Sequence, residues 1–271
     1  MAEIITLLTD FGVESTYPAQ MKGVILERVP SAVIVDMSHA VPRHDVHTAA
    51  FMLASAAPAF PDGTVHMAVV DPEVGSLRRV LAAEAAGHLY VAPDNGLLTL
   101  VAQRRMLLGG STAEGRVVAV ENESHFRADV SSTFHGRDVL APLAAALASG
   151  TPVDSLGPQV ESIERFDLPL PEREANMVRG QVLYVDPFGN LVTNIAGEMV
   201  TERDPSAVEI HVSGAVIRGL CRAYCDVAAG MLLAYVGSAG LLEVAVNRQS
   251  AALRLGAGIG TRVAARLPSV S

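Results

Sequence analysis

The chain has 271 residues, half of them hydrophobic, which is enough apolar material for one or two folded domains. Its 29 acidic and 20 basic residues give a formal net charge of −9 at pH 7 with histidine neutral. This balance argues against a protein that grips a nucleic-acid backbone or an anionic membrane surface, because both need clustered Lys and Arg. Aromatic residues make up 4% of the chain and Trp is absent, which also disfavours a base-stacking surface for single strands.

Cysteine usage and the N-terminal segment point to a cytoplasmic protein. Cys221 and Cys225 are the only cysteines, too few for a disulfide scaffold and without a second Cys/His pair for zinc. The first residues carry an acid at Glu3 and no basic stretch, so we expect no signal peptide. The longest uncharged run, Val227–Leu242, is shorter than the roughly 20 residues that span a bilayer.

Strand and helix patterns alternate along the first half of the chain. A short apolar run with β-branched residues predicts a strand at Ile4–Thr9, and apolar spacing predicts a helix at Tyr17–Val29 that Pro30 ends. Alternation of this kind predicts a mostly parallel sheet with helices on both faces. The further elements expected in this half are strands at 32–36, 65–70 and 89–92 and helices at 46–57 and 138–148.

The composition changes near residue 160. Residues 161–179 are charged and contain Pro169 and Pro171, which is typical of a linker. From Gly180 onward, short β runs separated by Gly predict a small all-β domain, a barrel or a sandwich. We therefore expect an N-terminal α/β domain over 1–165, a linker over 166–179 and a C-terminal β domain over 180–271.

Three acidic residues directly follow predicted strands: Asp10, Asp71 and Asp94. Each by itself is also typical of a turn or a helix cap. The carboxyl ends of parallel strands meet at one edge of a sheet, where open α/β folds bind ligands. Three acids in equivalent places therefore favour a shared site.

Other motifs carry less information. The run Gly256–Gly260 lacks the spacing of a dinucleotide-binding loop, and no G-x-S-x-G segment supports a serine hydrolase. The histidines at 39, 44 and 47 show no recognised metal-ligand spacing. Thr133–Asp138 places a His, an Arg and an Asp at the start of a predicted helix. The pattern leaves open whether that segment is functional or whether Asp138 merely caps the helix and Arg137 pairs with a surface acid.

Six ordered segments carry a resemblance to a known family. They are Leu8–Gly12 with Met21–Ile25, Val69–Ser76 with Arg78–Arg79, Ala92–Gly96, Thr133–Asp138, Asp186–Ile195, and Gly237–Asn247. From residue 4 to about residue 262 the chain resembles the S-adenosyl-L-methionine (SAM) hydroxide adenosyltransferases. These are the adenosine-forming SAM hydrolases, relatives of the nucleoside fluorinase and chlorinase.

The resemblance implies hydrolysis of SAM to adenosine and L-methionine by in-line attack of water or hydroxide on C5′. It implies a homotrimer without metal or other cofactor, with substrate held between the N-terminal domain of one copy and the C-terminal domain of a neighbour. The family's catalytic Asp, Arg and His fall on Asp71, Arg78 and His135. We expect Asp71 and His135 to orient one water, and Arg78 to keep Asp71 ionised and to stabilise the developing hydroxide.

The same resemblance assigns the substrate contacts, although ordinary barrel core remains open for the two aromatic residues. Asp10 is expected at the ribose hydroxyls, Phe188 and Tyr224 around adenine, Asn190 at an adenine edge, Asp186 and Ser238 at the methionine end, and Glu243 and Val246 in the remaining C-terminal motif.

Three places in the sequence bear on the choice among related activities. His135–Gly136 stands where the halogenases carry Tyr followed by Ser or Gly, which favours hydroxide over halide as nucleophile. Glu73 stands where the family commonly has Gly, and Arg248–Gln249 replaces a smaller, Gly-containing stretch. The alternatives are therefore a non-catalytic SAM or adenosine sensor, a SAM-dependent halogenase, and a metal-dependent hydrolase built on the three histidines.

Overall fold

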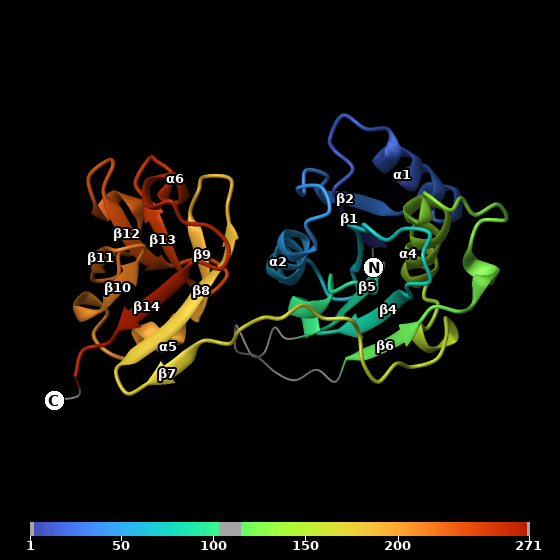
Figure 1. The fold of residues 1–271 in the computed structure, drawn as a ribbon. Helices are drawn as coiled ribbons and strands as arrows, with labels where there is room; N and C mark the ends of the chain where they lie inside the picture. Colours follow the sequence, from blue (N-terminus) through green and yellow to red (C-terminus); the bar gives the residue numbers. More distant parts are fainter. Residues whose placement is uncertain (1–2, 103–114, 270–271) are drawn as a thin grey trace. The chain divides into compact units, whose positions relative to one another are not determined.

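The computed structural model describes residues 3–102 and 115–269, which form two compact units (Figure 1). Described residues up to Phe166 belong to unit 1, and those from Asp167 onward belong to unit 2. Unit 1 is a mixed sheet with flanking helices, and unit 2 is an antiparallel, nearly barrel-like sheet. The predicted fold class is confirmed.

The sheet of unit 1 has the strand order β2-β1-β3-β5-β4-β6. Strands β2, β1, β3 and β5 run parallel, as the alternating pattern predicts, whereas β4 and β6 pair antiparallel at one edge. The strands are β1 (Ile4–Thr9), β2 (Val33–Ser38), β3 (Val65–Val69), β4 (Val80–Ala85), β5 (His88–Pro93) and β6 (Arg116–Ala119).

Helices cover both faces of this sheet (Figure 1). Leu7 and Met67 point to the face that packs against α1 and α4, and Leu8 and Ala68 point to the face that packs against α2. The central strands β1 and β3 are largely apolar on both sides because both sides are buried. The helices are α1 (Tyr17–Arg28), α2 (Val46–Ala56) and α4 (Ala141–Ala148), the last entered through a π-helical turn, η3 (Gly136–Leu140).

Unit 2 has the strand order β11-β10-β14-β8-β9-β13-β12, with β7 also paired to β8. Strands β7 and the start of β8 lie within residues 166–179, so part of the expected linker belongs to this sheet. The elements are β7 (Glu172–Glu174), β8 (Met177–Val185), β9 (Leu191–Ala196), α5 (Gly197–Thr201), β10 (Glu209–Val212), β11 (Ala215–Arg218), β12 (Leu232–Val236), β13 (Leu241–Val246), α6 (Ala251–Leu255) and β14 (Arg262–Arg266).

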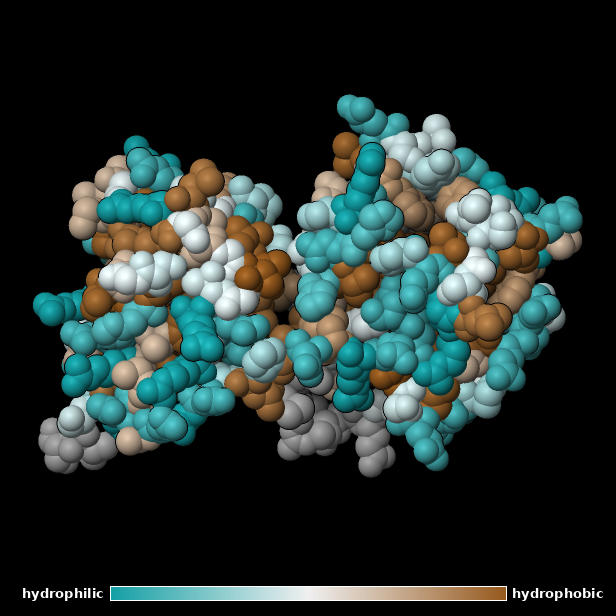
Figure 2. Space-filling view, in the orientation of Figure 1, coloured by the Kyte–Doolittle hydropathy of each residue, from teal (hydrophilic) through white to brown (hydrophobic). Residues whose placement is uncertain are grey.

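The two units differ in the polarity of the surface seen in Figure 2. On the face seen in Figure 2, hydrophilic side chains cover much of unit 1, and apolar side chains reach the surface at several points of unit 2. Phe188, Met231 and Leu253 are among the exposed apolar residues of unit 2. Within residues 3–102 and 115–269, no helix is both long and apolar enough to cross a membrane.

Candidate active site

Two predicted site residues follow neighbouring parallel strands of unit 1. Thr9 in β1 pairs in register with Val69 in β3, so Asp10 and Asp71 leave the sheet at the same edge. Asp10 Oδ2 accepts a 2.9 Å hydrogen bond from the backbone N–H of His44. One oxygen of the Asp10 carboxylate is thereby committed to the loop that follows β2.

Asp71 is held by Arg78 in a two-pronged ion pair. Arg78 Nε donates to Asp71 Oδ1 at 2.7 Å, and the second prong joins Arg78 Nη2 to Asp71 Oδ2. The side chains of Asp71 and Arg78 are only 5% and 4% exposed. A bidentate, charge-assisted pair of this kind fixes both groups in one orientation.

The turn between these two residues depends on Gly75. Its φ is +84°, and a Cβ there would run into the carbonyl oxygen of Ser132, so only glycine fits. Glu73 is exposed and donates its backbone N–H to Asp71 Oδ1 at 3.3 Å. Its φ is not in the left-handed region, so the turn does not require glycine at position 73.

His135 completes this cluster from the start of η3. Its Nδ1 lies 3.3 Å from Arg78 Nη2. Because a guanidinium only donates, Nδ1 is the acceptor, and the neutral ring carries its hydrogen on Nε2. Burial lowers the pKa of His135, and the charge of Arg78 lowers it further against the opposing effect of Asp71 and Asp138. The structure therefore brings Asp71, Arg78 and a neutral His135 together.

The loop that carries His135 is organised around Asp138, which is fully buried. Asp138 accepts two hydrogen bonds from Arg137, one from the backbone of Ser131 at 2.9 Å and one from Arg127 at 3.4 Å. The hydrogen bonds from Arg137 lower the pKa of Asp138. Asp138 is thus a buried ionic anchor for the loop rather than a simple helix cap.

The third strand-end acid behaves differently. Asp94 follows β5 at the shared edge, but it is buried and paired with Arg79 at 2.5 Å. Its second oxygen accepts a hydrogen bond from the backbone N–H of Glu164 at 2.8 Å. Both oxygens of Asp94 are therefore engaged by protein groups, and the expectation that it shares one ligand site with Asp10 and Asp71 stays a prediction.

Two of the three histidines considered as metal ligands, His39 and His47, make contacts within the protein. His39 Nδ1 lies 2.8 Å from Thr9 Oγ1, and its Nε2 lies 3.1 Å from Asp36 Oδ1. The ring of His47 stacks on that of Phe166 with centroids 4.0 Å apart. Across the described ranges, no three His, Cys, Asp or Glu side chains are grouped to hold one ion.

In unit 2, three predicted contacts share the turn between β8 and β9. Asp186 Oδ1 accepts from the backbone N–H groups of Phe188 at 2.9 Å and Asn190 at 2.8 Å, and its Oδ2 accepts from Asn190 Nδ2 at 2.7 Å. Gly189 takes φ +81° in this turn. The carboxylate of Asp186 thus shapes the turn that presents Phe188, whose side chain is 78% exposed.

A chain of hydrogen bonds runs from this turn into the sheet of unit 2. Asn190 Nδ2 donates to Tyr224 Oη at 3.1 Å, Tyr224 Oη lies 2.6 Å from Tyr235 Oη, and Tyr235 donates to Glu243. Burial raises the pKa of Glu243, and the charge of Asp186 raises it further. Burial and the bond to Glu243 likewise raise the pKa of Tyr235. Asn190, Tyr224 and Glu243 therefore belong to one network.

The remaining two predicted contacts of unit 2 lie beside this network. Ser238 is exposed on the turn between β12 and β13. A Cβ on the preceding Gly237 would overlap the carboxyl group of Glu243, so this turn closes directly over Glu243. Val246, at the end of β13, is buried in the core of unit 2. Its side chain packs against apolar neighbours, and its backbone carbonyl accepts a 3.0 Å hydrogen bond from the backbone N–H of Gln249.

Comparison with known proteins identifies the family. Residues 5–157 match the SAM hydroxide adenosyltransferase N-terminal domain, and residues 180–264 match the C-terminal domain of the same name. The chain is 40% identical over 269 residues to the (R)-S-adenosyl-L-methionine hydrolase of Salinispora tropica, covering 96% of each chain. The chain belongs to the SAM hydroxide adenosyltransferase family. The resemblance predicted from the six motifs is confirmed.

Further members and more distant relatives agree with this assignment. The (R)-S-adenosyl-L-methionine hydrolase of Thermus thermophilus is 42% identical over 258 residues, covering 93% of this chain and 95% of the relative. A fluorinase of Nocardia brasiliensis is 29% identical, covering 96% of each chain. A crystal structure titled as an uncharacterized conserved protein from Thermotoga maritima superposes with a TM-score of 0.87 at 35% identity, covering 97% and 99% of the two chains.

Two features of this SAM hydroxide adenosyltransferase could not be assigned from motifs. Tyr235 joins Tyr224 to Glu243, and hairpin pairing offers a signal for it, because Tyr235 lies opposite Glu243 across the turn that follows β12. Arg248, one of the departures from the family pattern, adopts φ +63°. An L-residue in this conformation is strained, which is consistent with the glycine-containing stretch of the family.

Proposed function

We propose that this chain hydrolyses S-adenosyl-L-methionine to adenosine and L-methionine by in-line attack of water on C5′. The observation that carries the proposal is the buried Asp71–Arg78 pair with His135 Nδ1 at 3.3 Å from the same guanidinium. This cluster lies at the carboxyl edge of a mostly parallel sheet, where open α/β folds bind ligands. The family assignment supplies the reaction class.

The reaction needs no general acid for the leaving group, but it needs an accurately positioned nucleophile. The sulfonium of SAM is a good leaving group, so methionine departs without protonation. A water molecule must instead be held in line with the C5′–S bond, and such positioning can lower the activation barrier by about 7–11 kcal/mol. A rigid ion pair and a neutral imidazole are suited to this task because neither needs to reorganise during the reaction.

The hydrogen-bond pattern distinguishes the roles of Asp71 and His135. The Nδ1 lone pair of His135 is engaged by Arg78, so the ring offers an N–H donor at Nε2 rather than a base. Asp71 accepts from Arg78 with both oxygens, and Oδ1 also accepts from the backbone N–H of Glu73, so the second lone pair of Oδ2 is the acceptor site proposed for the water. We therefore assign Asp71 as the group that accepts a hydrogen bond, and finally a proton, from the attacking water. His135 donates to the water oxygen.

The substrate contacts follow from the groups that the two units offer. The oxygen of Asp10 that does not bind His44 suits the ribose hydroxyls. Asn190 commits its Nδ2 to Asp186 and Tyr224, which leaves its carbonyl oxygen to accept from adenine. Phe188 and Tyr224 supply aromatic faces for the base. Asp186, Ser238, Glu243 and Val246 complete the proposed binding set.

We also propose a cytoplasmic homotrimer that needs no metal or other cofactor, with substrate held by unit 1 of one copy and unit 2 of a neighbour. Leu77, on the loop beside Arg78, is fully exposed, as is most of Phe188. Large apolar side chains left exposed near functional residues are typical of interaction surfaces. A neighbouring copy would cover both.

Product analysis in ¹⁸O-labelled water tests the reaction. SAM should yield adenosine with ¹⁸O in the 5′-hydroxyl and unlabelled methionine. Asp71→Ala and His135→Ala should each lose most turnover while the oligomer stays intact. Label in methionine, absence of turnover, or full activity in both variants would contradict the proposal. Tight adenosine binding without product would indicate a sensor, and 5′-chloro-5′-deoxyadenosine formed in chloride would indicate a halogenase.

Subunit mixing tests the assembly. Asp71→Ala disables the unit 1 half of the site, and Asn190→Ala disables the unit 2 half. If the two halves come from different copies, mixed oligomers of the two inactive variants contain some intact sites. Recovery of activity on mixing, together with a trimeric mass by sedimentation, is the expected result. No recovery in demonstrably mixed oligomers would contradict a shared site.

A further inference from the structure

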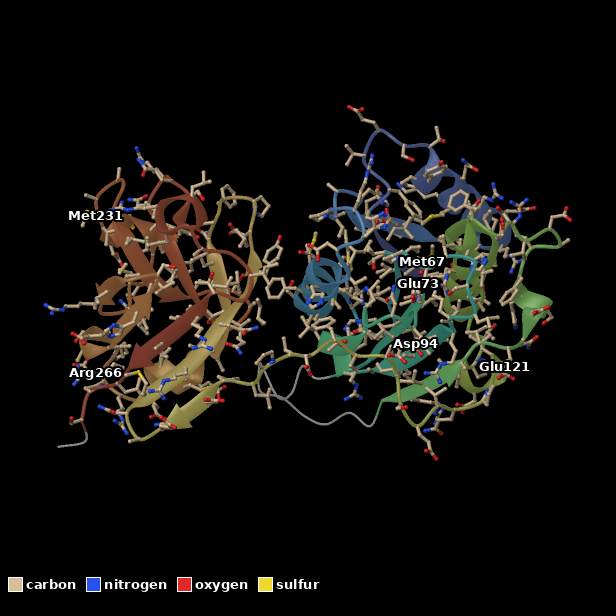
Figure 3. All side chains as sticks on the ribbon, in the orientation of Figure 1. Met67, Glu73, Asp94, Glu121, Met231 and Arg266 are labelled. Atoms are coloured by element: carbon tan, nitrogen blue, oxygen red, sulfur yellow. The ribbon has the colours of Figure 1, made fainter. Side chains whose placement is uncertain are left out.

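Asp94 is a buried carboxylate whose two oxygens hold different parts of unit 1. It is 5% exposed, directly after β5. Its Oδ2 accepts from Arg79 Nε at 2.8 Å and pairs with Arg79 Nη2 at 2.5 Å. Its Oδ1 accepts from the backbone N–H of Glu164 at 2.8 Å. Figure 3 labels Asp94 together with Glu73, which lies on the loop between Asp71 and Arg78.

Asp94 also binds the main chain of Arg79. The backbone N–H of Asp94 donates to the carbonyl oxygen of Arg79 at 3.0 Å, and Arg78 Nη1 lies 3.4 Å from the same oxygen. Asp94 therefore fixes both the side chain and the carbonyl of the residue next to Arg78. The carbonyl in turn contacts the guanidinium that binds Asp71 and His135.

The neighbouring residue holds the other end of the same loop. Asn95 Nδ2 donates to the carbonyl oxygen of Val70 at 2.8 Å, directly before Asp71. Asp94 and Asn95 thus fasten the segment from Asp71 to Arg78 at both of its ends. Gly75 and Ser76 shape the turn between them. Ser76 Oγ accepts a 3.2 Å hydrogen bond from the backbone N–H of Arg78.

We propose that Asp94 is a positioning residue for the reaction: through Arg79 it holds the Arg78 guanidinium in the orientation that binds Asp71 and contacts His135. This inference rests on the proposed function for its kinetic consequence. Asp94 touches neither Asp71 nor His135 directly, so its effect reaches the reacting groups only through Arg79 and Arg78.

The test compares Asp94→Asn with Asp154→Asn. Both changes turn a carboxylate in an ion pair of unit 1 into an amide, but Asp154 pairs with Arg116 at an exposed surface position. Asp94→Asn should fold, because the Arg79 guanidinium is 42% exposed and remains hydrated without its partner. Its kcat should fall about tenfold to a hundredfold, as expected for a small misplacement of catalytic groups, with KM changed by less than about threefold. Asp154→Asn should match the wild type.

A second measurement is independent of global stability. It is the rate at which the Arg78 Nε–H proton exchanges with solvent, followed by ¹⁵N NMR. The bond to Asp71 protects this proton in the wild type. Exchange should accelerate in Asp94→Asn and stay unchanged in Asp154→Asn. If Asp94→Asn does not fold, Arg79→Gln removes the same contact from the more exposed side and carries the same expectations.

The outcomes separate this inference from the proposed function. A wild type that does not release adenosine and methionine contradicts the proposed function, and the exchange rates still decide whether Asp94 positions Arg78. Unchanged exchange of the Arg78 proton in a folded Asp94→Asn variant overturns the inference, whatever happens to kcat. Faster exchange with unchanged kcat in an active enzyme overturns it as well.

Discussion

Acid should destabilise unit 1 through His66, a fully buried histidine in β3. Its Nδ1 lies 2.8 Å from Thr6 Oγ1, and its Nε2 lies 3.2 Å from His88 Nδ1. The rings of Phe60 and Tyr90 pack against it, with centroids 5.6 and 5.2 Å away. Burial, helped by the neighbouring His88, lowers the pKa of His66 from 6.5 to about 3.

The sign and size of the effect follow from these two pKa values. A histidine with a lower pKa in the folded state binds more protons when the chain unfolds, so acid favours the unfolded state. The stabilisation is complete above pH 6.5 and is lost as the pH falls toward 3. Between about pH 7.5 and about pH 4.5, His66 should cost unit 1 about 2–3 kcal/mol of unfolding free energy.

Urea unfolding at the two pH values measures this loss. Far-UV circular dichroism reports mainly on unit 1, because the described helices longer than five residues lie there. In His66→Gln the amide can replace the ring nitrogen near His88, and the pH-dependent loss should be smaller than in the wild type by about 2–3 kcal/mol. His125→Gln, at a half-buried position, serves as the control and should keep the wild-type loss. Equal losses in wild type and His66→Gln would refute the reasoning.

Three further predictions concern the candidate site and its surroundings. The pKa of His135 is lowered, and its neutral form is the proposed donor. The fall of kcat/KM on the acid side of the pH profile should therefore have its midpoint below the ordinary histidine pKa of 6.5. A midpoint at or above 6.5 would contradict the assigned tautomer. Tyr235→Phe leaves Glu243 without its hydroxyl partner, so the unfolding free energy of unit 2 measured in urea should fall by about 1–3 kcal/mol, and KM for SAM should rise. An unchanged KM would show that this network does not contribute to substrate binding. Arg248→Gly removes a left-handed L-residue and should raise the unfolding free energy by about 0.5–1 kcal/mol, whereas Arg262→Gly, in a strand, should lower it by a similar amount.

Apolar runs bounded by Pro, Gly or Asp predicted the parallel part of the unit 1 sheet well. Strand β1 was predicted with its observed bounds, Ile4–Thr9, and β3 within one residue. The antiparallel strand β4, at Val80–Ala85, was missed because three of its six residues are Ala, which has a low preference for strands. Strand β7, Glu172–Glu174, is charged and exposed, and only its pairing with β8 makes it a strand.

The site shows the same division between local and tertiary information. Motifs identified Asp71, Arg78 and His135, but they could not say that Arg78 would occupy the Nδ1 lone pair of His135, which is a contact across 57 positions. Asp94 looked equivalent to Asp71 because both follow strands at one edge. The difference arises from Arg79 and Glu164, whose approach to Asp94 depends on the folded loop.

The pairing of acids in this site bears on how a cationic substrate reacts. In the proposed reaction, positive charge leaves the sulfur and develops on the attacking water. An unpaired carboxylate near sulfur would stabilise the ground state more than the transition state and would slow the reaction. Asp71 is neutralised by Arg78, and Asp94 by Arg79. Both of these unit 1 carboxylates are thus paired with arginines, and in the proposed reaction Asp71 acts where positive charge appears, on the water. The net charge of −9 consequently says little about catalysis, because the carboxylate proposed to act on the water is paired with an arginine.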